Sequence, residues 1–211
     1  MQHIERPAVA LHWEYYIELE KDLLTASRYV NFTEDQLSVH SQFFTQILVC
    51  AATEFECVCK VIADKVEISN VGNIGSIKEM LSPIMPTLSQ CQLELLRGSL
   101  RTRPFADWEE IGTPLCWWTS YNDTKHLRNR DVSPGSLRNA MYALGGLFIA
   151  NLVLANTLKE YEALIPHQLF AIQPFVDDAD PLFKPRNYYQ RPRFSLLEKD
   201  GKLKPTPQQT L

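Results

Sequence analysis

The stretch that decides the fold is residues 139–158, NAMYALGGLFIANLVLANTL, which carries no formal charge along its whole length. A helix that is apolar on all sides is either the centre of a bundle or a membrane span, and this one is long enough to cross a bilayer. Its asparagines, its glycine pair and the chain's mean hydropathy of -0.20 favour the bundle. Gly146 and Ala150, four residues apart, allow a neighbouring helix to approach closely. We therefore expect a central helix surrounded by the others, with a membrane span as the alternative.

Two earlier helices are predicted from the spacing of apolar residues. Residues 11–30 place apolar side chains at alternating steps of three and four. Thr33 followed by Gln36 forms a capping-box signature, so a second and longer helix is expected over residues 33–65. Glu54 falls within the apolar arc of that helix, where a carboxylate needs a partner unless it reaches water at the rim. Both interpretations of Glu54 stay open at this point.

Two later helices have proline start signals. Thr113-Pro114 offers a cap and a first-turn proline for a third helix over residues 115–128. Ser133-Pro134 repeats the signal for the fourth helix, which contains the uncharged stretch and is expected to end near residue 164.

The remaining segments are less regular. Residues 76–81 form a short helical piece, 90–104 are expected to be a loop with strands, and 168–176 are a strand or a docking segment. The repeated prolines in the residues after 176 disfavour a regular helix or strand in the core there. The chain thus divides into a helical domain, 1–165, and an extended C-terminal arm, 166–211. The expected fold class is all-α: a four-helix up-and-down bundle with long second and fourth helices, a short irregular or β-hairpin excursion, and an extended C-terminal tail.

Composition narrows the classes of function. The 211 residues are 45% hydrophobic and 22% charged, as in ordinary soluble domains, and the net charge of -4 gives no general attraction to nucleic acid or membranes. The five cysteines are odd in number and follow no signal segment, so a reducing, cytoplasmic compartment is expected. No Glu-x-x-His motif is present, and we expect neither a metal nor another cofactor.

The chemically densest stretch is residues 115–130, LCWWTSYNDTKHLRNR. Six of its side chains share one helical surface through i, i+3 and i+4 spacing; they are Trp118, Asn122 and His126, with Tyr121, Lys125 and Arg128 on the adjoining stripe. Such a set suits binding a phosphate or a ribose hydroxyl, and an imidazole is able to move a proton near neutral pH. The alternative is a buried structural network in which Lys125 or Arg128 pairs with Glu54.

The helix order and one motif resemble a known family. A long second helix, a polar helix reading YNDTKHLR at 121–128 and then a long apolar helix resemble the HEPN superfamily of bacterial defence and toxin systems. The resemblance covers about residues 11–160. Active members carry an arginine, a polar residue, three variable residues and a histidine, and many are metal-independent ribonucleases that work as dimers with facing motifs. Asn122 matches the polar position and His126 the histidine.

Tyr121 stands where the family has its arginine. A tyrosine supplies no permanent cation to a phosphate, although Lys125 or Arg128 lies one turn away. The resemblance therefore implies a homodimeric RNA- or nucleotide-binding module, non-catalytic or weakly catalytic, in a stress or defence setting. Its candidate catalytic residues are His126, Asn122 and Tyr121, and its candidate binding residues are Trp118, Lys125, Arg128 and Glu54. The alternative is a protein-interaction or assembly protein whose polar network is purely structural.

Overall fold

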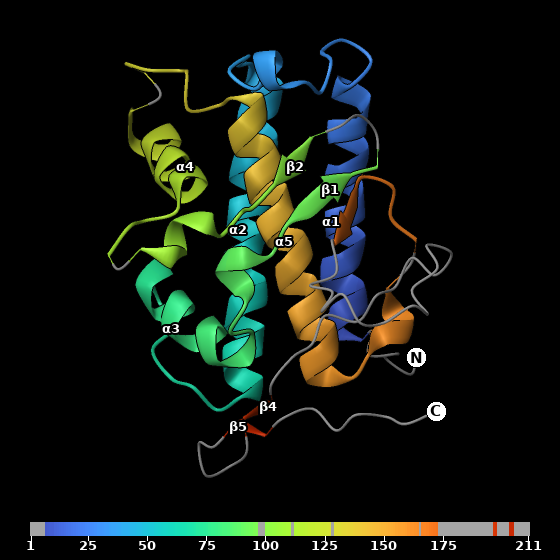
Figure 1. Ribbon diagram of the computed structural model, residues 1–211, viewed down its shortest axis with the longest axis vertical. Helices are drawn as coiled ribbons and strands as arrows, with labels where there is room; N and C mark the ends of the chain where they lie inside the picture. Colours follow the sequence, from blue (N-terminus) through green and yellow to red (C-terminus); the bar gives the residue numbers. More distant parts are fainter. Residues whose placement is uncertain are drawn as a thin grey trace, which may run out of the picture.

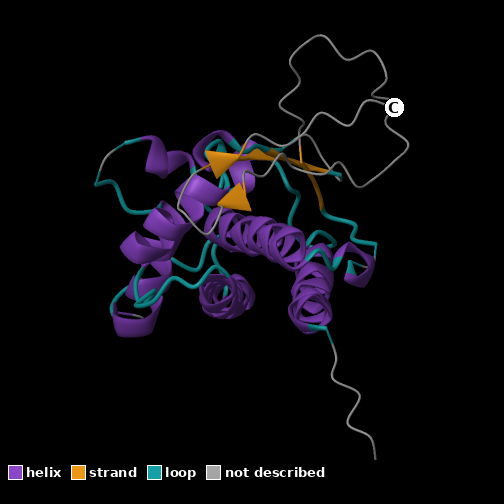
Figure 2. Cartoon of the chain, turned by 90° about the horizontal axis from the view of Figure 1, so that it is seen from below, coloured by secondary structure: helices purple, strands orange, loops and turns teal. Residues whose placement is uncertain are grey.

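Helix α5, Leu137–Leu158, lies at the centre of the computed structural model (Figure 1). Fifteen of its 22 residues are buried, and they lie on every side of the helix. It contacts α1 (Ala8–Ala26), α2 (Gln42–Lys65) and α4 (Cys116–Leu127). Viewed along the helices, α5 lies between the strands and the pair formed by α1 and α2 (Figure 2). The uncharged stretch is thus a core helix of this fold.

The structure describes residues 7–172, with gaps at 97–99, 111, 128 and 165, and two short strands at 196–197 and 203–204. Most of this part is α-helical, so the expected mainly helical class is confirmed. Helix α3, Ile74–Ile84, covers the short helical piece predicted there and extends past it. Arg128 and most of the predicted arm lie outside the described residues.

A three-stranded antiparallel sheet covers the side of α5 away from α2. Its order is β2 (Arg101–Thr102), β1 (Leu93–Leu95) and β3 (Phe170–Ile172), with Leu93 opposite both Thr102 and Ile172. The hairpin of β1 and β2 lies within the segment predicted to hold strands. The third strand comes from the predicted arm, and it pairs with a strand about 75 residues away along the chain. A further pair, β4 (Leu196–Leu197) and β5 (Leu203–Lys204), is antiparallel.

A buried carboxylate holds the chain just before β3. Glu20 of α1 is 2% exposed, and its oxygens accept hydrogen bonds from the backbone N–H groups of Gln168 and Leu169 at 2.8–3.0 Å. The Tyr16 hydroxyl donates to the same carboxylate at 2.9 Å. Donors of this kind are what a buried carboxylate needs, so Glu20 joins α1 to the start of β3. Next to it, burial lowers the pKa of His167, which favours the neutral imidazole.

The predicted start of the second helix is wrong. Residues 34–36 form a separate 3-10 turn, and the Thr33 side chain makes no capping bond. The α-helix begins at Gln42, where the Ser41 hydroxyl accepts from the Phe44 N–H at 3.1 Å. The residues just before Ser41 do not extend the helix, because His40 pairs with Ser136, at the start of α5, in an isolated β-bridge. A local capping signature was therefore overridden by contacts with the start of α5.

The predicted ends of the central helix also need correction. Ser136, and not Ser133, caps α5, since its hydroxyl accepts from the Asn139 N–H at 3.3 Å. The helix ends at Leu158, because Lys159 adopts a left-handed conformation with φ of 58°. Helix α1 was predicted over residues 11–30. Both of its ends lie closer to the N-terminus than predicted, at Ala8 and Ala26.

Within the described residues, α5 is the one helix long and apolar enough to cross a bilayer by length and composition. Of its most apolar window, 72% is buried inside the protein. The core helix of a soluble protein meets the same criterion.

The glycine pair of α5 allows close packing on two sides. A Cβ at Gly145 would lie 2.8 Å from Leu93 Cδ1 and 2.9 Å from Pro104 Cγ, and one at Gly146 would lie 3.0 Å from Trp117 Cζ2. These distances are shorter than normal carbon contacts, so a side chain at Gly145 would push the sheet away. The close approach predicted for Gly146 involves the Trp117 side chain of α4.

Replacing Gly145 with valine is expected to lower the free energy of unfolding by about 1–3 kcal/mol, because the added methyl groups overpack the contact with β1. Urea denaturation measures this change. Gly72→Val is the matched control: nothing lies within 4 Å of a Cβ there, and its effect should stay within about 0.5 kcal/mol. Equal effects at the two positions would contradict the close packing of the sheet on α5.

Candidate functional site

Helix α4 carries the dense polar stretch and is fixed by its aromatic side. The Asp107 carboxylate accepts from the Cys116 N–H at 2.8 Å and so satisfies one of the free N–H groups of the first turn. Trp117 is fully buried and its Nε1 donates to the Pro104 carbonyl at 2.7 Å. Trp118 lies 8% exposed against it, with ring centroids 5.8 Å apart. One face of α4 is therefore a packing face.

Tyr121 belongs to this packing face. It is 4% exposed, and its ring centroid lies 5.2 Å from that of Trp118. Its hydroxyl lies 3.3 Å from Thr53 Oγ1 on α2 and accepts from Lys125 Nζ at 3.3 Å. The ammonium also lies 4.7 Å from the centre of the tyrosine ring, a cation–π contact. The predicted neighbours Trp118, Tyr121 and Lys125 are thus brought together.

The other predicted residues of α4 lie toward solvent. His126 and Lys125 are exposed, and Asn122 is half-buried at the edge of the packing face. The alternative of a buried structural network expected His126 to be inside the protein, and its exposure counts against that version. Arg128 lies outside the described residues.

Glu54 has a partner, and it is one that the sequence did not indicate. Its Oε1 lies 2.5 Å from Nδ1 of His12 on α1, with side-chain exposures of 17% and 12%. Lys125, one of its predicted partners, bonds Tyr121 instead. Thr53 and Glu54 are adjacent on α2, about 100° apart around the helix, which explains why one contacts α4 and the other α1. Glu54 is therefore separated from the predicted cluster on α4.

A second polar group adjoins the pair of His12 and Glu54. Burial, and next the interaction with the Cys50 thiol, raise the pKa of the Tyr15 hydroxyl to about 12, with a further contribution from Glu54. Burial also raises the pKa of Cys57, which disfavours a reactive thiolate there. His12, Tyr15 and Cys50 are polar groups that sequence reasoning missed, because their spacing fits an ordinary amphipathic helix.

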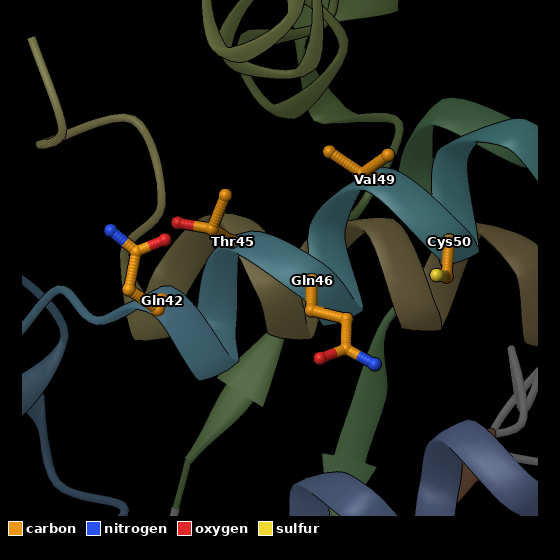
Figure 3. A pocket seen from close by; sticks show the side chains of 5 residues that line it. All are labelled: Gln42, Thr45, Gln46, Val49 and Cys50. Carbon is orange, nitrogen blue, oxygen red and sulfur yellow. The ribbon is translucent and has the colours of Figure 1, made fainter. Parts of the chain in front are cut away.

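An open pocket of about 390 Å³ lies along the outer side of α2 (Figure 3). Its lining residues follow helical spacing on one stripe, and they are Gln42, Thr45, Gln46, Val49 and Cys50. Thr45 and Val49 point toward α4 and the chain that follows it, and Gln46 and Cys50 point toward α1. The pocket thus lies on the stripe of α2 that has α4 on one side and α1 on the other.

The described part of the chain holds no group of three His, Cys, Asp or Glu side chains able to hold a metal ion. What α4 offers is an exposed imidazole, an exposed ammonium and an amide. These groups bind anions and hydrogen-bonding ligands.

The chain matches no family model, no curated protein and no solved structure.

A double-mutant cycle with His12→Ala and Glu54→Ala is expected to give a coupling energy of about 1–3 kcal/mol in unfolding free energy, as for a mostly buried charge-assisted hydrogen bond. Glu54→Ala combined with Lys125→Ala is the control. That pair should be additive to within about 0.5 kcal/mol, because Lys125 bonds Tyr121. Coupling in the control cycle and none in the first would show that Glu54 pairs with α4 after all.

Proposed function

We propose that the protein is a HEPN-like RNA- or nucleotide-binding module, built as a four-helix up-and-down bundle with long second and fourth helices. The observation that carries the proposal is the arrangement of α4. Its aromatic face is anchored in the core, while Lys125 and His126 are exposed and Asn122 lies half-buried beside them. Arg130, just beyond the helix, is exposed as well. A rigid helix that presents cations and an amide suits a phosphate and its sugar.

The same arrangement supports binding with little or no cleavage. Tyr121, at the position of the family's arginine, is buried, and its hydroxyl already contacts Thr53 and Lys125. A buried neutral phenol stabilises the charge that develops on a phosphate less than a guanidinium does. Lys125 supplies a cation beside it, so any remaining activity would be weak and metal-independent, with His126 moving the proton.

We further propose a cytoplasmic homodimer acting in a stress or defence setting, with the α4 helices of the two copies facing each other. Leu127 and Val132, at the end of α4 and in the loop after it, are 41% and 49% exposed. Burying exposed apolar side chains of this kind stabilises an interface. They also favour the second candidate function, a protein-interaction or assembly protein that binds no RNA.

Lys125→Glu is expected to weaken binding of a fluorescein-labelled single-stranded RNA by about tenfold at low salt, because a phosphate contact becomes a repulsion. Fluorescence anisotropy measures the change. Lys65→Glu is the matched control: Lys65 is also an exposed lysine in the last turn of a helix, and its reversal should leave affinity within about twofold.

Incubating the RNA with the wild type and with His126→Ala separates binding from catalysis. The proposal expects slow or no cleavage by the wild type and none by the variant. Fast cleavage would contradict the weakly catalytic version. Absence of both binding and cleavage in the wild type would leave the assembly function as the better account.

A further inference from the structure

The pocket on α2 is chemically distinct from the exposed face of α4. Three of its five lining side chains carry amide or hydroxyl groups, and the other two are Val49 and Cys50. None of the five carries a formal charge at neutral pH. A site of this composition recognises an uncharged ligand with both donors and acceptors, since the Gln46 amide offers both kinds of group.

The pocket is flanked by an aromatic ring on the α1 side. The Tyr15 hydroxyl interacts with Cys50, and the residue as a whole is 43% exposed. An aromatic ring beside the pocket residue Cys50 offers a planar surface on which a base stacks.

On its other side the pocket faces α4, which carries the Lys125 ammonium. Val49 points toward α4, as Figure 3 shows. One turn further along α2, about 5–6 Å in rise, Thr53 contacts the Tyr121 hydroxyl, which also accepts from Lys125. Neutral hydrogen-bonding groups and an ammonium therefore follow one another along the outer side of α2.

We propose that this pocket is the base-binding subsite of the site on α4: it takes the base and ribose of a ribonucleotide unit whose phosphate lies at Lys125. The inference rests on the proposed function and adds to it a ligand class and a position. The volume of about 390 Å³ falls in the range of small-molecule sites. Gln46 provides paired donor and acceptor groups for the base edge, and Tyr15 provides the stacking surface.

The test compares two labelled oligomers of equal length, one a single-stranded RNA and the other a matched abasic oligomer with the same phosphates. The wild type should bind the RNA at least about tenfold more tightly than the abasic oligomer, as expected when base contacts add to phosphate contacts. Gln46→Leu keeps a side chain of similar size and removes both the donor and the acceptor of the amide. It should reduce that preference to within about threefold while leaving the affinity for the abasic oligomer unchanged.

Gln90→Leu, an exposed glutamine in the 3-10 turn of residues 88–90, is the matched control and should keep the wild-type preference. Equal binding of RNA and abasic oligomer by the wild type, or an unchanged preference in Gln46→Leu, would overturn the subsite while the phosphate site at Lys125 survives. Binding of both oligomers weakened by about tenfold in Lys125→Glu, with the preference of Gln46→Leu reduced, supports both proposals. A wild type that binds neither oligomer overturns the subsite together with the proposed function.

A competition experiment with a mononucleotide distinguishes a free nucleotide ligand from an RNA strand. Competition by a ribonucleoside monophosphate that weakens in Gln46→Leu supports a free nucleotide in the subsite. Competition by RNA oligomers alone, with the same dependence on Gln46, supports an RNA strand.

Discussion

The need to bury α5 on every side determines the rest of the structure. A helix without a charged residue from 139 to 158 gains stability only when apolar partners surround it, at about 25 cal/mol for each Å² of apolar surface removed from water. Helix α2 packs along one side, α1 and α4 flank it, and the strands cover the remaining side. The two glycines let Leu93 and Trp117 come close enough to complete this enclosure.

The packing of the other elements around α5 determines where the polar residues lie. With its inner face against α5, α2 keeps an outer stripe between α1 and α4, and adjacent residues on that stripe face different neighbours. Thr53 contacts Tyr121 of α4, and Glu54 contacts His12 of α1. Helix α4 is likewise divided, with its tryptophans and Tyr121 inside and His126 exposed. The exposed polar surface is thus a consequence of the buried packing, and it offers a rigid platform for a ligand.

Patterns within single helices were predictable, and contacts between distant segments were not. The uncharged stretch and the polar helix were located to within a few residues at most ends, because helical spacing and capping are local properties. The need of Glu54 for a partner was also visible, but the identity of His12 was not, since 42 residues separate the two. Likewise, Glu20 interrupts an apolar row in the sequence. Its role as acceptor for the backbone N–H groups of Gln168 and Leu169 is visible only in the structure, because those residues are far away along the chain. The failed capping signature at Thr33 shows the same limit: contacts with the start of α5 decided the outcome.

Native-state hydrogen exchange followed by mass spectrometry tests the central place of α5 most directly. If α5 is enclosed on all sides, amides between residues 140 and 155 exchange only through global unfolding, so their protection equals the free energy of unfolding measured with urea. The more exposed α3 and the outer turns of α1 should open at lower free energy. Exchange in α5 that is faster than in α1 or α3, or that occurs well below the global free energy, would contradict a fold organised around this helix.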